Sequence, residues 1–243
     1  RGTVFRDIDM YAGKNLGYGT PQQTAMILKG EPEKKLKQGN KEIWQYPSLE
    51  LTFENGKVVK WKRTAEYEGH PYDSAMYCYN KAFELDEEGS ERKNIRENLV
   101  PYRDYLWTEG IMKFYNDDME AAVTALKRSA SIYNIPEMEG QDTTNYNIGQ
   151  VYFYGGQFAT EVNQLKDAKD FYENLIAYNN EVEEAGHPEN KIEEKNSYRF
   201  LAVTYRKMNQ PEKQKETLDK AYKKFGEDKN ILLDFTQFYL DQG

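Results

Sequence analysis

The residues that could carry acid–base or metal chemistry are few in this chain. Its two histidines, His70 and His187, are each followed by proline in loop-like sequence. Neither has a nucleophile or a metal ligand at motif spacing, so we expect both to be solvated turn residues and not general bases. Cys78 is the one cysteine, which excludes an intrachain disulfide. We expect it to be a small buried residue and not a reactive thiol.

Acidic clusters and glycines add no catalytic signal. The Asp117-Asp118 pair, like the other acidic clusters, lacks the spacing of a metal-binding loop, and a solvated helix end explains it. The Gly17–Gly19 segment lacks the third glycine and the preceding apolar strand of a nucleotide-binding loop. The sequence therefore predicts a protein that is not an enzyme and that uses no cofactor and no metal.

A pattern of small and bulky residues recurs along residues 67–243. Tyr205 and Tyr239 lie 34 residues apart, and Ala202 on a first predicted helix is followed by Leu218 and Ala221 on a second. A small residue lets two helices cross closely, and a bulky residue fills the space beside it. The template fits three further places: Gly110 with Met119, Ala122 and Leu126; Gly149 with Tyr152, Ala168 and Tyr172; and Ala75 with Tyr79 and Ala82.

This pattern resembles the tetratricopeptide repeat family. The resemblance implies a mainly α fold in which helix pairs form a right-handed α-α superhelix over residues 67–243. With Gly149 as its anchor, one unit needs an insertion of about seven residues around positions 155–157. The Ala75–Ala82 helix is expected to be a second helix with a degenerate partner. The run from Ala75 to Phe153 is also similar to exported repeat proteins of Bacteroidetes, through Tyr79 to Asp86, Gly110, the helix over 119–126 and Asp142 to Gly149. This second resemblance implies a periplasmic or cell-envelope location in a bacterium.

Residues 1–66 differ in composition and are predicted to form a separate small α+β domain. They hold 12 lysine and arginine residues against 8 acidic ones, whereas the whole chain has a net charge of −8. Thr20 and Gln23 form a predicted capping box around Pro21, which starts a helix over about 21–29 that ends at Gly30. The Lys34–Lys41 segment is expected to be a solvated loop.

Three strands follow in the prediction, at about 43–46, 49–54 and 57–62. Asn55-Gly56 is a strong signal for a two-residue hairpin turn between the last two. Val59 and Trp61 are expected on the apolar face. The order of elements resembles the small SmpA/OmlA (BamE-like) envelope lipoprotein domain, which implies protein contact and not chemistry. The residues that carry this resemblance are Gly19-Thr20, Gln23, Ile27-Leu28, Gly30, Pro32, Trp44, Tyr46, Leu51, Phe53 and Asn55 to Val58.

In tetratricopeptide proteins a ligand groove is lined by five positions of each first helix, and the resemblance carries these positions onto this chain. The predicted groove is aromatic in two units and basic in the third, which suits a peptide with apolar anchors and an acidic end. The alternative is that several aromatics belong to the core between repeats. The groove residues are Asp104, Trp107, Ile111, Phe114 and Tyr115; Thr143, Tyr146, Gln150, Phe153 and Tyr154; and Asn196, Arg199, Val203, Arg206 and Lys207.

Two functions remain open at this point. The first is a protein–protein interaction scaffold that binds a protein or peptide segment in the groove. The second is a glycan- or membrane-surface-binding module, in which groove aromatics stack on sugar rings and Lys34, Lys35 and Lys37 meet an anionic surface. A nucleic-acid partner is disfavoured because the chain is acidic, with a pI of about 5.1.

Three expectations concern the chain as a whole. No apolar run approaches the roughly 18–20 residues of a membrane span, so no transmembrane segment is predicted. The chain begins at Arg1 and not at methionine, which indicates a processed or truncated start. The last predicted helix, over Asp228–Gly243, has no second helix to cover it, so a homo-oligomer through this helix is a further prediction.

Overall fold

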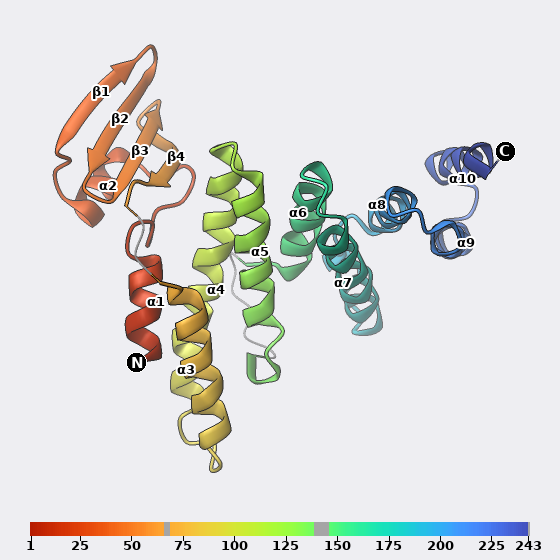
Figure 1. The fold of residues 1–243 in the computed structure, drawn as a ribbon, viewed down its shortest axis with the longest axis horizontal. Helices are drawn as coiled ribbons and strands as arrows, with labels where there is room; N and C mark the ends of the chain where they lie inside the picture. The colour runs from red at the N-terminus through yellow and green to blue at the C-terminus, as the bar shows by residue number, and fades with distance from the viewer. Residues whose placement is uncertain (66–68, 139–145, 243) are drawn as a thin grey trace. The chain divides into compact units, whose positions relative to one another are not determined.

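The computed structural model describes residues 1–65, 69–138 and 146–242. The chain is mainly helical and carries one small antiparallel sheet (Figure 1). It divides into two compact units, Arg1–Tyr146 and Asn147–Gly243. The domain boundary predicted at residue 66 therefore falls inside the first unit.

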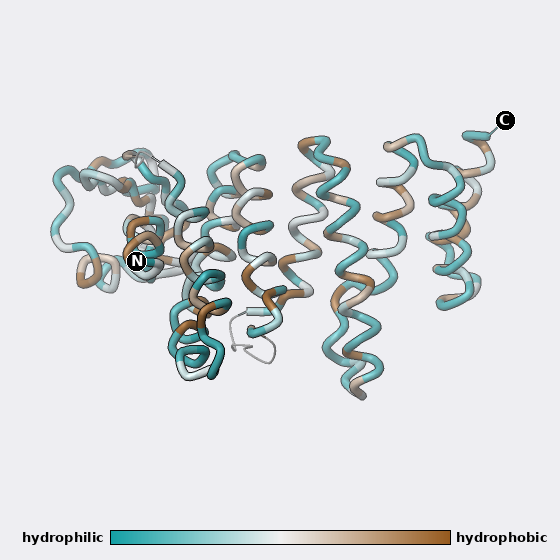
Figure 2. The backbone as a smooth tube through the Cα atoms, turned by 60° about the horizontal axis from the view of Figure 1, so that its bottom comes forward, coloured by the Kyte–Doolittle hydropathy of each residue, from teal (hydrophilic) through white to brown (hydrophobic). Residues whose placement is uncertain are grey.

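The sheet of the first unit has four antiparallel strands in the order β1-β2-β3-β4, with α2 (Gln22–Lys29) against one face (Figure 1). The Lys34–Lys41 segment, expected to be a loop, contains the edge strand β1 and the start of β2. Its backbone hydrogen-bonds to β2, and its lysines are tolerated because an edge strand is solvated. Figure 2 shows this edge as mostly hydrophilic. The strands are β1 (Lys34–Gln38), β2 (Lys41–Tyr46), β3 (Leu49–Glu54) and β4 (Lys57–Arg63).

The β3–β4 hairpin turns at Asn55-Gly56, where both residues have the positive φ of a type I′ turn. A β-bulge shifts its register, because Phe53 pairs with Val58 while Thr52 pairs with Lys60. Val59 is thus the extra residue, and the bulge turns Val58 onto the buried face in its place. The prediction that Val59 faces the core is wrong for this reason.

The predicted capping box at Thr20 is not formed. Thr20 Oγ1 accepts a hydrogen bond from the Gly17 amide (3.0 Å) and donates one to the Gly17 carbonyl (2.8 Å). The hydroxyl therefore closes the preceding turn, and α2 begins at Gln22 without a side-chain cap. The helix ends before Gly30, which has a φ of 77°.

The helices of the first unit are antiparallel neighbours, and the first of them was not predicted. α1 and α3 lie side by side (Figure 1), and a β-carbon built on Gly2 would lie 3.2 Å from the Tyr79 ring. α1 is therefore the missing partner of the Ala75–Ala82 helix, with the sheet inserted between the two halves of the pair. The helices are α1 (Gly2–Met10), α3 (Pro71–Leu85), α4 (Arg92–Tyr115), α5 (Met119–Tyr133) and the 3-10 turn η1 (Pro136–Met138).

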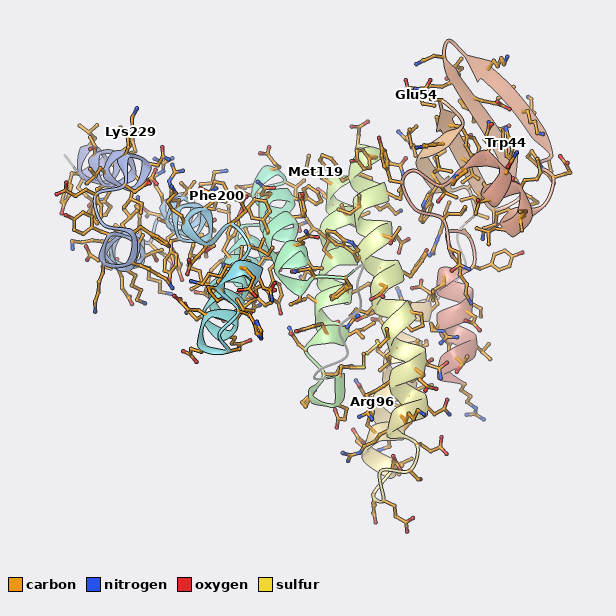
Figure 3. All side chains as sticks on the ribbon, turned by 180° about the vertical axis from the view of Figure 1, so that it is seen from behind. Trp44, Glu54, Arg96, Met119, Phe200 and Lys229 are labelled. Carbon is orange, nitrogen blue, oxygen red and sulfur yellow. The ribbon has the colours of Figure 1, made fainter. Side chains whose placement is uncertain are left out.

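One hydrophobic core joins the sheet to these helices. It runs from Trp44 and Trp61 of the sheet through Leu16 to Tyr102 and Leu106 of α4. Trp61 Nε1 donates a hydrogen bond to the Leu16 carbonyl (3.2 Å), so the largest buried side chain is also satisfied as a donor. Trp44, labelled in Figure 3, is buried on β2.

A buried ionic cluster, here called the Arg63 cluster, lies where β4, α1 and α4 meet. Arg63 donates to the Asp9 carbonyl and, at 2.8 Å, to the Tyr105 hydroxyl, and its guanidinium lies 3.4 Å from Glu109 Oε1 and 3.8 Å from Asp9 Oδ1. The Tyr102 hydroxyl donates to Asp9 Oδ2 at 2.6 Å. One cation thus serves two buried carboxyl groups, which ties the sheet to both helices.

The Arg63 cluster predicts a pH dependence of stability. Burial raises the pKa of Glu109, and the opposing charge of Arg63 does not fully offset it. The pKa of Glu109 is therefore higher in the folded state than in the unfolded state, and the protonated carboxyl group adds to the stability of the folded state at low pH. This added stability is lost as pH rises through the folded-state pKa. Glu109→Gln should therefore flatten the stability profile above pH ~4.5, measured by urea unfolding at several pH values. If the Glu109→Gln variant keeps the same dependence of stability on pH, Glu109 is not the group that causes it.

The second unit is a run of helices in which each packs on its neighbours in sequence. α9 ends before Gly226, which has a φ of 65°. The elements are α6 (Ile148–Glu161), α7 (Leu165–Glu184), the 3-10 turn η2 (Pro188–Asn190), α8 (Glu194–Lys207), α9 (Pro211–Phe225) and α10 (Lys229–Gln242).

The crossing points of the helix pairs recur at 46 residues and not at 34. Gly110, Gly156 and Ala202 follow one another at this interval, and each packs on the bulky residue 16 positions later. A β-carbon on Gly110 would overlap Leu126, and one on Gly156 would overlap the ring of Tyr172. These contacts fix the small residue of each first helix.

The unit predicted from Gly149 was therefore anchored seven residues too early. The expected insertion around 155–157 is wrong, because Gly155 and Gly156 lie inside α6 and face the rings of Phe171 and Tyr172 on α7. Two adjacent glycines looked like a loop, yet here they admit two aromatic rings against a helix backbone. The 20-residue helix α7 and the turn after it account for extra length before α8.

Candidate partner-binding surfaces

Four predicted groove residues lie on one face of α4 in the first unit. Trp107, Ile111, Phe114 and Tyr115 are spaced by four, seven and eight residues from the first, which places them on neighbouring turns of one side. Tyr115 is exposed, and the other three are half-buried. The α4 residues that were predicted from the tetratricopeptide resemblance therefore lie together on a partly solvated face of this helix.

Sequence reasoning missed Tyr18, which joins this surface from the segment before α2. Its ring stacks on Tyr115 with centroids 5.2 Å apart and planes 23° apart, and the two side chains are 60% and 43% exposed. Phe114 meets Tyr115 edge-on at 5.4 Å. Tyr18 and the four α4 residues together are here called the α4 aromatic surface. The glycines on either side of Tyr18 indicated a turn, but no sequence signal placed that turn against α4.

Tyr146 belongs to the core and not to a groove. It is only 4% exposed, and its ring lies 3.9 Å from the guanidinium carbon of the fully buried Arg103. Its hydroxyl is 3.1 Å from Ser129 Oγ. The prediction that Tyr146 is open to a ligand is therefore wrong, and the cause is the misplaced register of the Gly149 unit. Thr143, from the same set, lies outside the described residues.

In the second unit, the register anchored at Gly156 keeps Gln150 and Phe153 among the predicted groove positions and removes Tyr154. Gln150 is exposed on α6. Phe153 is half-buried, with its ring 6.2 Å from that of Phe200, labelled on α8 in Figure 3, so part of it is packing between helices. Tyr154 is partly exposed and borders Phe158. The positions that replace those lost are Gln157, Thr160 and Glu161.

The two arginines predicted to hold a partner's carboxylate already bind carboxylates of α10. Arg199 makes a bidentate pair with Asp234, at 2.6 Å from Nε and 3.3 Å from Nη2. Arg206 Nη1 lies 3.7 Å from Asp241 Oδ2. Lys207 is exposed on the same helix. The pairs join α8 to α10, so an acidic partner would have to compete with them.

α10 leaves apolar side chains in solvent. Leu233, Tyr239 and Leu240 are exposed, whereas Ile231 and Phe238 are buried against the preceding helices. The helix therefore packs with one stripe only. Association of two copies through this helix stays a prediction.

The groups considered for chemistry are dispersed. His70 and His187 are exposed, and His187 Nδ1 lies 3.3 Å from the exposed Glu189. Cys78 is half-buried, whereas the sequence analysis predicted a buried residue. In the part of the chain that the structure describes, no three His, Cys, Asp or Glu residues come together as a metal site.

None of the described helices is both long enough and apolar enough to cross a membrane. No protein-family model matches this chain, and no curated protein sequence matches it at a significant level. The candidate site is therefore assigned from geometry.

Proposed function

We propose that the protein is a non-enzymatic protein–protein interaction scaffold of the bacterial cell envelope, built from tetratricopeptide-like helix pairs in a right-handed superhelix. The observation that carries the proposal is the α4 aromatic surface, in which the exposed Tyr18–Tyr115 stack adjoins Phe114. The repeated small-residue crossings at Gly110 and Gly156 support the helix-pair architecture.

Aromatic side chains suit this role because they offer a large contact area at a low cost in conformational entropy. Tyrosine and tryptophan are enriched among residues that dominate binding energy at interfaces. The Tyr18–Tyr115 stack is held by α4 and by a turn closed at Thr20, so its geometry is set before a partner arrives. Binding then needs little ordering of the surface.

The partner that fits is a protein segment with apolar anchors. The paired state of Arg199 and Arg206 removes the main support for an acidic end on the segment. The α4 aromatic surface carries no such requirement, since stacked tyrosine rings accept aliphatic, proline or aromatic side chains.

The double variant Tyr18→Ala/Tyr115→Ala tests the proposal. Pull-downs from envelope extracts of the native bacterium, quantified by mass spectrometry, should lose the specific partner at least about tenfold, because interface tyrosines contribute about 2 kcal/mol or more when they are hot spots. The matched control is Tyr77→Ala/Tyr222→Ala, which removes two tyrosines that are 70% and 41% exposed elsewhere. Equal recovery with both variants would exclude the α4 aromatic surface.

A glycan- or membrane-surface-binding module is the second candidate. The observation that favours it is the open edge strand β1, where Lys34 and Lys37 are exposed, while Lys35 lies over the Trp44 ring at 4.6 Å. Binding to anionic vesicles through these lysines would weaken as ionic strength rises, whereas stacking of the tyrosines on a neutral glycan would not.

A further inference from the structure

A cavity of about 210 Å³ lies in the first unit, where the ends of α1 and α2 meet the β2–β3 turn. Its walls include the apolar side chains of Ala12, Leu28 and Leu49, of which Ala12 and Leu49 are buried. A single water needs about 10–15 Å³ of such volume, so the cavity has room for a small organic ligand. Neither the α4 aromatic surface nor the β1 edge takes part in it.

Lys29 is the one charged residue that lines this cavity among the residues described. Its side chain is half-buried, and Nζ donates a hydrogen bond to the Tyr11 carbonyl (3.2 Å). An ammonium group has three donors, so this bond leaves two for other partners. The lysine therefore brings a partly dehydrated positive charge to a space that is lined by both polar and apolar groups.

No carboxylate pairs with Lys29 within the described residues. Glu31, two positions later, lies 3.6 Å from Lys35. The nearby charge is Lys14, another cation, which itself lies 3.8 Å from Asp7. Burial first, and the charge of Lys14 second, lower the pKa of Lys29. An anion placed in the cavity would relieve both effects.

One further polar group at the cavity can orient an acid. Ser48 brings a hydroxyl that can donate to a carboxylate, whereas the Tyr46 hydroxyl already donates its proton to the Gly30 carbonyl (3.2 Å). A carboxylate has two acceptor oxygens, which match the free donors of Lys29 and the Ser48 hydroxyl. The apolar walls take a short aliphatic group.

We propose that this cavity binds a small carboxylate with a short apolar chain, with the carboxylate on Lys29 and the chain against Leu28 and Leu49. The ligand is either a free short-chain acid or the C-terminal residue of a peptide, since both present the same chemistry. The site is separate from the α4 aromatic surface, and its failure would leave the proposed scaffold function untouched.

Titration of the isotope-labelled full chain by NMR tests the proposal without any substitution. Butyrate should shift the amide signals of Ser48 and Leu49, with a dissociation constant on the order of 1–10 mM for so small a ligand. Butyramide, the neutral analogue, should bind at least about tenfold more weakly than butyrate. Equal shifts with both, or no shift with any probe, would overturn the proposal.

Peptides distinguish the two sources of the acid. Gly-Gly-Val with a free carboxylate should bind more tightly than butyrate if the site takes a chain end, and the amidated peptide should not bind. If butyrate binds and both peptides fail, the site takes free acids, and the carboxylate assignment stands.

Two variants locate the charge. Lys29→Met should weaken butyrate binding by about 10- to 100-fold, the range for a charged hydrogen bond. Lys14→Met, which removes a neighbouring lysine that does not line the cavity, should keep binding within about threefold. The reverse ranking would overturn the proposal. Should Lys29→Met not fold, the butyrate–butyramide comparison decides alone.

Discussion

Replacement of Arg63 by methionine should lower the free energy of unfolding of the first unit by about 3–5 kcal/mol, the cost of breaking a buried ion pair from one side. Arg63→Met removes the partner of Asp9 and Glu109, whose side chains are only 5% and 9% exposed. It also leaves the Tyr105 hydroxyl without its donor. Because domains are stable by only about 5–15 kcal/mol, the variant should unfold at a much lower urea concentration than the unmodified protein.

Urea unfolding followed by tryptophan fluorescence measures this effect directly. Trp44, Trp61 and Trp107 are the three tryptophans of the chain, and all lie in the first unit, so the signal reports that unit alone. Lys62→Met is the matched control, since the exposed Lys62 makes a solvent-facing pair with Glu50 (3.4 Å) and should change stability by less than about 0.5 kcal/mol.

A rescue experiment separates lost charge pairing from lost packing. The triple variant Arg63→Met/Asp9→Asn/Glu109→Gln leaves no unpaired charge in the Arg63 cluster and should regain a large part of the stability. If the single and triple variants unfold at the same urea concentration, the carboxyl groups are not what the arginine stabilises.

Gly156→Ala should destabilise the second unit by about 1–3 kcal/mol, although alanine is intrinsically the better helix residue. The added methyl group would overlap the Tyr172 ring, which is buried between helices. In a Tyr172→Ala background the overlap disappears, and the same substitution should become stabilising by about 0.5–1 kcal/mol. This change of sign is the specific signature of a helix crossing at Gly156.

The second unit contains no tryptophan, so tryptophan fluorescence does not report on its unfolding. Hydrogen exchange of the α6 and α7 amides measures both effects instead. Gln157→Ala, at the next position of α6, is the control and should leave the exchange rates nearly unchanged. A Gly156→Ala cost that is the same with tyrosine or alanine at position 172 would argue against the crossing.

Local signals in the sequence were sufficient for some elements. Asn55-Gly56 defined its hairpin because a type I′ turn needs two residues with positive φ, whatever surrounds it. Gly30 and Gly226 ended their helices for a similar reason. Short-range backbone chemistry decides these features, so a single sequence contains what is needed.

Features that depend on distant residues could not be read in the same way. α1 pairs with α3 across the inserted sheet, and the lysine-rich β1 is a strand only because β2 offers its backbone. Propensity alone favours a loop at Lys34–Lys37. The bulge that replaces Val59 by Val58 is likewise set by pairing with β3.

The candidate site shows the same division. Trp107 and Tyr115, taken as groove positions from the tetratricopeptide resemblance, lie on one side of α4, because helical period is a local property. The partners of Arg199 and the stack of Tyr18 on Tyr115 join residues 35 and 97 positions apart, and no local pattern encodes them. The 46-residue interval was missed because the expected period of 34 was taken from the spacing of Tyr205 and Tyr239.

The proposal that the α4 aromatic surface binds a protein segment is tested most directly by site-specific photo-crosslinking in cells of the source organism. A photoreactive phenylalanine analogue replaces Tyr115 in one strain and the exposed Tyr77 of α3 in another. The proposal predicts a discrete crosslinked protein from position 115 that position 77 does not give. The same products from both positions, or none from position 115 with the probe incorporated, would contradict it.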